Sequence, residues 1–263
     1  MKTLIRMMAA ASCAAVLAGS AWAQTGNKSL MISNGLKFLN VPYVEHVLDE
    51  DSKEDLIINC DEMDCTTFVE YTLAMSLSPV KDGQVSEGDF ARMVQKIRYR
   101  DGKIDGYASR LHYMSDWIDN GLRNGFLTDI TAQYSSDKLT LSVDYMTTHA
   151  AAYKRLASSP ENVARMKEVE KALTGKTVYY LPKDKLPVNG LPWIQNGDII
   201  AITTDKPGLD IAHMGLAFYV GDKLGLLHAS SESKKVEVSP LTLSQLLDNH
   251  ETWTGIRVIR MSE

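Results

Sequence analysis

The stretch IAHMGLAFYVGDKLGLLHAS (residues 211–230) has the pattern of two β-strands joined by a tight turn. Gly221-Asp222 is typical of a two-residue hairpin loop, and the residues on both sides of it alternate in character. This alternation puts on one face of the first strand Ile211, His213, Gly215, Ala217 and Tyr219. The opposite face, which we expect to lie in the core, carries Ala212, Met214, Leu216, Phe218 and Val220.

The length of the hairpin loop decides how the two histidines of this stretch are related. If the loop contains two residues, Val220 pairs with Lys223 and the register sets Gly215 across from His228. His213 and His228 then share one face as diagonal neighbours, with Cα atoms about 7 Å apart. A loop one residue longer would put them on opposite faces. The alternative is that the two histidines are unrelated, one of them buried and the other exposed.

The remainder of the chain divides into a helical first half and a β-rich second half. Capping residues and apolar spacing predict helices over about 33–40, 65–77, 86–97, 115–121 and 159–174. After residue 176, further strands are predicted at TVYYL (177–181), GDIIAIT (197–203), KKVEVSP (234–240) and GIRVIR (255–260). The pattern indicates an α+β fold, in which a helical N-terminal half packs on a C-terminal antiparallel β-sheet.

A cysteine lies at the start of the second predicted helix, in DEMDCTTFVE (residues 61–70). Asp64 is a good N-cap, and Cys65, Val69 and Leu73 recur at four-residue spacing. The N–H groups and dipole at a helix start stabilise a thiolate, which favours a nucleophilic role for Cys65. The alternative is that Cys65 packs in the apolar stripe, as many buried cysteines do.

A cysteine nucleophile needs a base, and the paired histidines provide one. One imidazole could take the thiol proton while the other fixes its tautomer through a hydrogen bond. The sequence therefore predicts a catalytic group made of Cys65, His213 and His228.

The first 23 residues have the features of a secretory signal. Lys2 and Arg6 precede an Ala-rich apolar run that ends in Ala21-Trp22-Ala23, a small-x-small cleavage pattern. Ser20 stands where a lipoprotein signal would need a cysteine, so we expect no lipid anchor. Cleavage would leave residues 24–263, which we expect to form one catalytic domain that is periplasmic or secreted. No later apolar run reaches the roughly 20 residues of a membrane span.

Charge and cysteine content narrow the function further. Loss of the signal, which carries no acidic residue, would change the formal net charge from −5 to −7, so we expect no nucleic-acid partner. Cys13 would leave with the signal, and the mature chain keeps Cys60 and Cys65. Cysteine arithmetic alone leaves open both a disulfide between them and two free thiols. We expect a monomer that needs no cofactor.

The order of these motifs resembles a known family. Cysteine at a helix start in DCTTFVE, then strands with HMGLAFYV and LLHAS, resembles the Cys–His–His order of NlpC-type bacterial cell-wall peptidases, which are papain-like in fold. Further segments resemble the N-acetylmuramoyl-L-alanine amidase-like branch of that superfamily: VPYV (41–44), SRLHYMSDW (109–117), GDIIAITT (197–204), GLDIAHMG (208–215) and GIRVIR (255–260). The resemblance extends over about residues 30–261.

This resemblance implies roles for individual residues. Cys65 would be the nucleophile, His213 the general base and His228 the residue that orients the base. Tyr43 would line the substrate cleft near the oxyanion site. The resemblance further implies that substrate is bound by Arg110, His112, Tyr113 and Asp210.

For these last residues, an internal ion pair between Arg110 and Asp210 and simple packing of His112 and Tyr113 are the alternatives. Two positions depart from the family pattern. Asn40 stands where relatives commonly have glycine, and Cys60 lies five residues before the nucleophile. We expect Cys60 to be free or functionally silent in the active form.

The function implied is a cysteine-dependent amidase that acts on peptidoglycan fragments at the amide between N-acetylmuramic acid and L-Ala. The close alternative is an endopeptidase that cleaves the γ-D-Glu–diaminopimelate bond with the same residues. A zinc amidase would have to use ligands among His112, His149, His213, His228 and Asp210, but their spacing lacks the tight motif usual for zinc. A secreted, non-catalytic glycan-binding module is the remaining alternative.

Overall fold

The computed structural model describes residues 5–6, 30–49 and 53–262. The signal peptide expected over residues 1–23 therefore lies outside the described residues, apart from the short strand β1 (Ile5–Arg6). This strand pairs in parallel with β2 (Ile58–Asn59). Within the described residues, no helix combines the length and the apolar character that crossing a membrane requires.

Helices make up most of the first half, as the sequence predicts. The longer ones are α2 (Cys65–Leu77), α3 (Glu87–Arg98), α4 (Met114–Arg123) and α8 (Pro160–Leu173). The shorter ones are α1 (Leu30–Gly35), α5 (Thr131–Tyr134), α6 (Tyr145–Thr148), α7 (Lys154–Ala157) and α9 (Leu243–Asp248). Single 3₁₀ turns cover η2 (Leu36–Phe38), η3 (Arg100–Gly102), η4 (Tyr107–Ser109), η5 (Ala150–Ala152) and η6 (Lys183–Lys185).

Side-chain caps confirm the predicted starts of α2, α3 and α8. Helix α4 instead begins at Met114, one residue before the predicted start, and has no side-chain cap. Ser86 accepts a hydrogen bond from the backbone N–H of Asp89 at the start of α3, and Ser159 caps α8, which has Pro160 in its first turn. The helix predicted over 33–40 is shorter than expected, because α1 already gives way to a 3₁₀ turn at Leu36.

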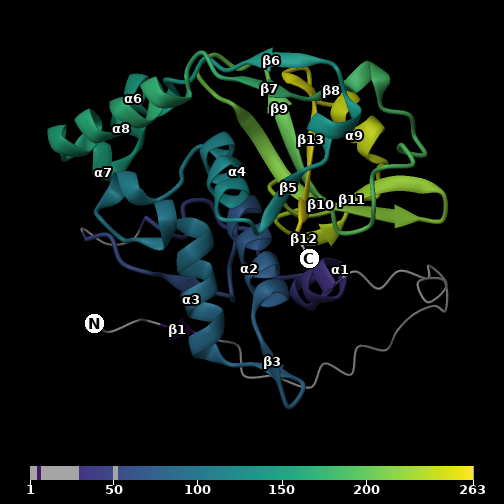
Figure 1. Ribbon diagram of the computed structural model, residues 1–263, viewed down its shortest axis with the longest axis horizontal. Coiled ribbons are helices and arrows are strands. Elements are labelled where there is room, and N and C mark those ends of the chain that lie inside the picture. The colour runs from purple at the N-terminus through teal and green to yellow at the C-terminus, as the bar shows by residue number, and fades with distance from the viewer. Residues whose placement is uncertain (1–4, 7–29, 50–52, 263) are drawn as a thin grey trace.

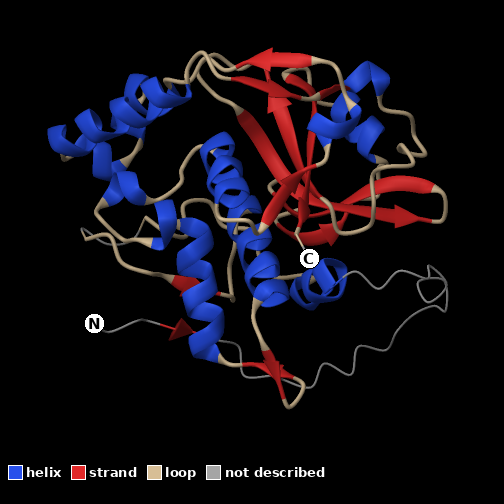
Figure 2. Ribbon diagram, viewed as in Figure 1, coloured by secondary structure: helices blue, strands red, loops and turns tan. Residues whose placement is uncertain are grey.

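An antiparallel sheet occupies the second half and faces the helices (Figure 1, Figure 2). Within the described residues it has seven strands, in the order β12-β11-β10-β9-β13-β5 with β8 also paired to β13. Their bounds are β5 (Leu127–Asp129), β8 (Leu181–Pro182), β9 (Ile199–Thr204), β10 (Ile211–Val220), β11 (Lys223–Ser230), β12 (Lys235–Val238) and β13 (Trp253–Met261). Small separate pairs are formed by β3 (Val80–Lys81), β4 (Gln84–Val85), β6 (Lys138–Thr140) and β7 (Thr177–Tyr179).

The sheet differs from a simple C-terminal meander in two respects. Its last strand, β13, returns to lie beside β9, and its edge strand β5 comes from the helical half of the chain. The run TVYYL divides between β7, which pairs with β6, and β8, which pairs with β13. These pairings join segments far apart in the sequence, so local patterns could not predict them.

The β10–β11 hairpin has the predicted two-residue loop and register, with Val220 opposite Lys223 and Leu216 opposite Leu227. One predicted face assignment is wrong. A β-bulge lies between Ile211 and His213, and Ile211 packs in the same core cluster as Met214. The extra residue of the bulge interrupts the alternation on which the prediction depended.

Apolar side chains form cores on both sides of the sheet. Helices α1 to α3 contribute to one core, where Phe68 and Leu73 of α2 pack with Met214 and Leu216 of β10. The opposite side is covered by α9 and the 186–194 segment (Figure 1). A third core lies among α6, α7 and α8. Helix α2 is thereby fixed against β10, and Cys65 is held at its first turn.

The structure explains why asparagine is tolerated at position 40. Asn40 has a φ of 66°, in the left-handed region where glycine and asparagine are favoured. Its N–H donates to the carbonyl of Val236, and three residues later the chain reaches Tyr43, whose N–H donates to the carbonyl of Lys234. The departure from the family glycine therefore leaves the backbone turn available.

Candidate active site

The start of α2 holds Cys65 against strand β10, an interior strand of the sheet. Asp64 and Thr67 form a capping box, in which the carboxylate accepts the Thr67 N–H at 2.8 Å and the hydroxyl oxygen accepts the Asp64 N–H at 2.9 Å. The half-buried Cys65 accepts a hydrogen bond from the backbone of Met214, the residue after His213. The cysteine therefore lies beside the strand that carries the predicted base.

The ionisation of Cys65 differs from the sequence expectation. Burial, and then the neighbouring Asp64 carboxylate, raise the pKa of the Cys65 thiol to about 12. Hydrogen bonds from Met214, Thr66 and the cysteine's own backbone lower it by less than these two effects raise it. The resting group is thus a thiol, and the helix start does not by itself supply a thiolate. A nucleophilic role for Cys65 requires a base.

The predicted histidine pair is formed. His213 Nε2 lies 2.7 Å from His228 Nδ1, and the two rings meet edge to face with centroids 4.9 Å apart. Gly215 makes this approach possible, because a Cβ at that position would lie 2.9 Å from the Cβ of His228. The hydrogen bond leaves Nδ1 of His213 as the nitrogen available to another group. For Nδ1 to accept a proton, Nε2 must carry the hydrogen and donate it to His228.

Both histidines are held neutral by their surroundings. Burial, then the neighbouring His228 and His250, lower the pKa of His213 well below its ordinary value. Burial also lowers the pKa of His228 to about 4. The pair is therefore uncharged at neutral pH, which is the state in which an imidazole accepts a proton.

Two aromatic side chains that sequence reasoning missed complete the surroundings of His213. Trp253 stacks on the His213 ring at a centroid distance of 5.7 Å and an angle of 8°. His250 stacks on Trp253 at 3.7 Å. Both residues lie about forty positions from His213 in the sequence, and no local signal marks them, although Trp253 lies two residues before the GIRVIR strand motif (255–260).

Tyr43 lies close enough to Cys65 for the two groups to interact electrostatically. Burial, and then the charges of Cys65 and Asp64, raise the pKa of the Tyr43 hydroxyl above its ordinary value. The hydroxyl is therefore protonated and can donate a hydrogen bond. The place of Tyr43 in a substrate cleft near the oxyanion site stays a prediction.

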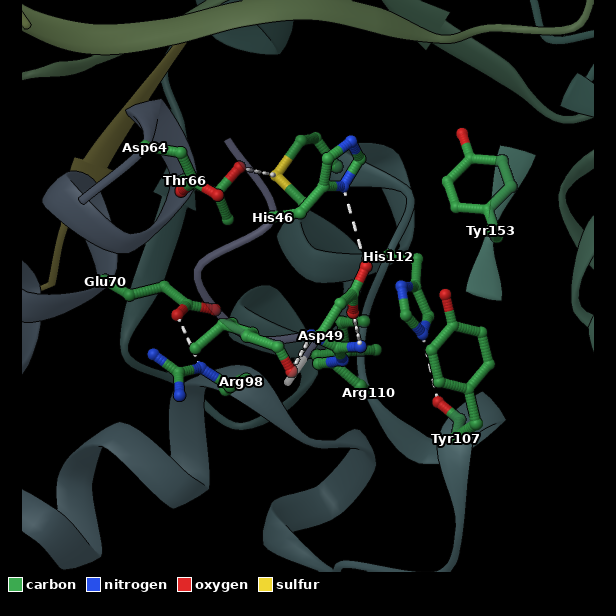
Figure 3. A pocket seen from close by; sticks show the side chains of 13 residues that line it. His46, Asp49, Asp64, Thr66, Glu70, Arg98, Tyr107, Arg110, His112 and Tyr153 are labelled. Atoms are coloured by element: carbon green, nitrogen blue, oxygen red, sulfur yellow. Dashed lines mark hydrogen bonds and ion pairs between the residues drawn. The ribbon is translucent and has the colours of Figure 1, made fainter. Parts of the chain in front are cut away.

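A cavity of about 140 Å³ opens next to the start of α2. Asp64 and Thr66, which flank Cys65, line one side, and Arg110 and His112 line another (Figure 3). Arg110 does not pair with Asp210, which was the structural alternative. Its guanidinium contacts Asp49 Oδ1 at 2.6 Å and Glu54 Oε1 at 3.2 Å. Sequence reasoning missed both of these partners.

The other charged groups of this cavity are also paired within the protein. Arg98 Nε donates to Glu70 Oε2 at 2.7 Å, and both side chains are almost fully buried. Asp64 is used by the helix cap and Asp49 by Arg110 (Figure 3). Arg98 and Arg110, with their partners Glu70, Asp49 and Glu54, thus form an ion-paired wall along this cavity.

His112, Tyr113 and Asp210 are all engaged inside the fold. His112 Nε2 donates to the carbonyl of Tyr107 at 3.0 Å, and its ring lines the cavity. Tyr113 lies in the third core, where its hydroxyl donates to Glu170 and accepts from the Met146 N–H.

Asp210, which directly precedes β10, accepts the backbone N–H of Ser115 at 2.6 Å in the first turn of α4. It therefore ties the start of the His213 strand to that helix. For Tyr113 and Asp210 the contacts found are structural, and their contact with substrate stays a prediction.

Cys60 and Cys65 are both free thiols. Cys60 is buried in the core that contains α2, and burial followed by the Asp61 charge raises its pKa to about 11. Among the described residues, no three histidine, cysteine or acidic side chains are grouped as metal ligands. Among the histidines named for the zinc alternative, all of which the structure describes, His213 and His228 form a pair through their ring nitrogens.

Fold and site together define an α+β protein that carries a thiol at a helix start beside a hydrogen-bonded pair of histidines. A model of the AmiA-like family, described as N-acetylmuramoyl-L-alanine amidase-like, matches residues 33–256. The chain belongs to this family. No curated protein matches it significantly.

Solved structures support the same grouping. A structure described as an N-acetylmuramoyl-L-alanine amidase from Bacteroides uniformis is 62% identical, covers 89% of this chain and 99% of its own, and has a TM-score of 0.88. A structure described as a putative xylanase from Bacteroides fragilis is also 62% identical, with coverages of 87% and 99% and a TM-score of 0.85. A protein from Legionella pneumophila, 24% identical with a TM-score of 0.65, shares the fold.

Proposed function

We propose that this protein is a papain-like, NlpC-type cysteine amidase that hydrolyses the amide between N-acetylmuramic acid and L-Ala in peptidoglycan fragments. The observation that carries the proposal is the position of Cys65 against Met214, next in the chain to a His213 whose Nε2 lies 2.7 Å from His228. The family match and the similarity to a structure described as an amidase support the substrate class.

The pKa values describe how such a reaction would begin. The Cys65 thiol has a raised pKa and His213 a lowered one, so a resting thiolate–imidazolium pair is disfavoured. Proton transfer from sulfur to Nδ1 of His213 would therefore accompany attack on the amide carbon. The imidazolium then gives this proton to the nitrogen of L-Ala as the carbon–nitrogen bond breaks. Water, deprotonated by the same imidazole, releases the acyl group as the muramic acid carboxylate.

Donors for the developing oxyanion lie at the start of α2. Cys65 is the first residue of α2, where helix N–H groups lack intrahelical partners, and Tyr43 adds a protonated hydroxyl. The raised pKa of Tyr43 suits this role, because a neutral hydroxyl donates where a phenolate could not.

The cavity beside Cys65 suits the peptide side of the substrate. Its volume is about 140 Å³, and charged and polar side chains line much of it. Arg110 is the cation in this wall whose fork could contact a carboxylate of the stem peptide, if Asp49 yields part of its ion pair. His112 lies on the same wall.

Glycoside hydrolysis, which the description of one similar structure suggests for that protein, fits this site poorly. Most glycosidases need two carboxyl groups free to act on either side of the glycosidic bond. The cavity carboxylates Asp49, Asp64 and Glu70 are each bound by another group of the protein. Amide chemistry at Cys65 is the better match to the groups present.

Mass spectrometry of defined muropeptides treated with the purified protein tests the proposal. We expect the parent to release free stem peptide from the sugar, and Cys65→Ala to lose activity by at least roughly 10³-fold. Cys60→Ala is the matched control and should keep activity, since Cys60 lies in the core. If the parent instead cleaves between γ-D-Glu and diaminopimelate, the proposed bond is wrong and the endopeptidase alternative is correct.

The same assay addresses the other two classes. Activity that survives exhaustive chelation but is lost on thiol alkylation would contradict a zinc amidase. Full function of Cys65→Ser in every assay would instead favour a non-catalytic glycan-binding module and contradict the proposal.

We also propose that the chain is exported, cleaved after Ala23 and released without a lipid anchor. Mass spectrometry of the protein recovered from the periplasm or medium of expressing cells should give an N-terminus at Gln24. Recovery of the uncleaved chain from the cytoplasm would contradict this.

A further inference from the structure

The ring of His213 is contacted from two directions. His228 meets it at an edge through the 2.7 Å hydrogen bond, and Trp253 covers a face, nearly parallel at 8°. A single hydrogen bond fixes one ring nitrogen but leaves the imidazole free to rock about that bond. A flat partner on the face opposes this motion, because stacked aromatic rings lose contact when they tilt.

Paired irregularities in the sheet bring Trp253 to this position. A register shift between Ile211 and His213 in β10 lies opposite Thr203 of β9. A second register shift, between Trp253 and Gly255 in β13, lies on the other edge of β9 at the same level, where Gly255 pairs with Thr203. Bulges increase the local twist and redirect side chains. Here they occur in the two strands that supply His213 and its stacking partner.

Hydrogen bonds hold the start of β13 in place. Thr203 Oγ1 and Thr254 Oγ1 lie 2.8 Å apart, and the Thr204 hydroxyl donates to the carbonyl of Thr252 at 2.9 Å. The N–H of Asp205 donates to the same carbonyl. The backbone on each side of Trp253 is therefore tied to β9, so that the indole has a defined position.

His250 supports the indole from the connection between α9 and β13. The ring centroids of His250 and Trp253 lie 3.7 Å apart at an interplanar angle of 22°. The backbone N–H of Trp253 donates to the backbone carbonyl of His250 at 3.2 Å. His250 Nε2 lies 3.5 Å from a carboxylate oxygen of Glu232, whose side chain is 72% exposed. The stack thus runs from the contact between His250 and the solvent-facing Glu232 carboxylate, through Trp253, to the buried His213.

We propose that Trp253, supported by His250, is a positioning residue for His213, which fixes the plane of the imidazole and with it the direction of Nδ1, the nitrogen that the proposed mechanism assigns to the Cys65 thiol. The inference rests on the proposed cysteine mechanism and adds to it a residue outside the Cys–His–His group. A misplacement of reacting groups by about 1 Å can cost roughly 10²-fold in rate, so a side chain that limits rocking of the base has a measurable effect.

Alkylation of Cys65 by iodoacetamide tests this without reference to any substrate. The sulfur–carbon bond forms as iodide leaves, and the thiol proton passes to His213. The rate is followed from pH 4 to 10 by mass spectrometry of the peptide that contains Cys65, which separates it from Cys60. His228 contacts His213 directly, and His250, which stacks on Trp253, also acts on it, so the profile reports these groups together with the Cys65 thiol that is alkylated.

The variants are Trp253→Leu, Trp253→Phe and His250→Gln, with Trp193→Leu as the matched control. Trp193 is also a partly buried tryptophan at the edge of the second core, but it stacks on Tyr134 instead of a histidine. We expect Trp253→Leu to lower the alkylation rate roughly tenfold or more and to move the pH midpoint, and Trp253→Phe to restore both to within roughly threefold. His250→Gln should give a smaller change in the same direction.

A purely structural role for Trp253 would give a different result. Trp253→Leu would then lower the melting temperature about as much as Trp193→Leu does, with the rate and pH profile of alkylation unchanged, and the proposal would be overturned. If Trp253→Leu does not fold, His250→Gln and Trp253→Phe carry the test, and parental profiles in both would overturn it.

His213→Ala separates this inference from the proposed function. If His213→Ala alkylates like the parent, His213 is not the base, and both the mechanism and this inference fail. If alkylation depends on His213 and Trp253 but no muropeptide is cleaved, the proposed substrate fails and the positioning role of Trp253 stands.

Discussion

Two buried regions near the start of α2 and strand β10 differ in how they place charge. One is an ion-paired wall, made of Arg98, Arg110 and their partners Glu70, Asp49 and Glu54. The other is the histidine pair, His213 and His228, whose pKa values are lowered by burial. In the wall, each arginine opposes the effect of burial on its carboxylate partner, although burial still raises the pKa of Glu70 and Glu54. The histidines have no counter-charge among the described residues, and burial acts on them unopposed.

The difference shows why each region suits its proposed task. A base must arrive without a proton, which burial ensures for the histidines. A surface that binds an ionic stem peptide must keep permanent charges in fixed directions, which buried ion pairs ensure. In the proposed mechanism Cys65 depends on the neutral region, because its own thiol pKa is raised to about 12.

The largest expected effect comes from breaking the ion-paired wall. Glu70→Ala leaves the guanidinium of Arg98 buried without a counter-charge and should lower the free energy of unfolding by about 3–5 kcal/mol. Urea denaturation measures the loss. Asp105→Ala, which removes the partner of Arg165 at the surface, is the control and should cost no more than about 1 kcal/mol. Equal losses in the two variants would mean that the wall is not held by this pair.

The buried histidine pair should make the protein less stable at acidic pH. The pKa of His228 is about 4 in the fold and about 6.5 when unfolded, so between these values the unfolded chain binds more protons. The contribution of His228 to the free energy of unfolding is fully present above pH 6.5. It falls by about 3 kcal/mol as the pH drops to 4, because protons bind the unfolded chain first. In His228→Gln this part of the slope should vanish, and the exposed His149→Gln should keep it. A parental slope in His228→Gln, measured by melting at each pH, would contradict a buried neutral pair.

A methyl group at position 215 should separate the histidines. A Cβ there would lie 2.8 Å from Leu226 Cγ and 2.9 Å from His228 Cβ, so Gly215→Ala should cost about 1–3 kcal/mol and slow alkylation of Cys65. In Gly225→Ala of the neighbouring strand, the nearest atom to the new Cβ is a carbonyl oxygen at 3.2 Å, which makes it the milder control. Unchanged alkylation in Gly215→Ala would show that the contact between the rings does not matter for the cysteine.

The smallest expected effect comes from a substitution that keeps the charge of Arg110 but changes the geometry of its hydrogen bonds. Arg110→Lys keeps the positive charge but loses the planar fork, and KM for muropeptides should rise roughly tenfold, about 1.4 kcal/mol, with little change in kcat. Arg100→Lys breaks a similar fork, to Asp116, away from the cavity beside Cys65, and should leave KM unchanged. If both variants behave alike, Arg110 has no special part in binding.

Local patterns were sufficient for the elements that carry Cys65 and the histidines. The N-cap and apolar spacing predicted α2 from its first residue to its last, and Gly221-Asp222 predicted the register that brings His228 to His213. These features depend on contacts within a few residues of each other, which is the range that a sequence pattern describes.

Contacts between distant segments were beyond the same reasoning. The stacking of Trp253 on His213, the pairing of Arg110 with Asp49 and Glu54, and the edge strand β5 all join segments far apart in the chain. The raised pKa of Cys65 belongs with them, because burial depends on how α2 packs against β10 and not on the helix start alone.

The bulge at Ala212 makes the site vulnerable to a change in chain length. Deletion of this one residue would give β10 an uninterrupted alternation, with Ile211 and Met214 still on the core face and His213 still opposite them. By pattern the shortened strand would be the more regular one, yet it would lack the local twist that the bulge supplies. Among related chains, a missing residue here would therefore be a better sign of lost activity than most substitutions, even where all the catalytic side chains are retained.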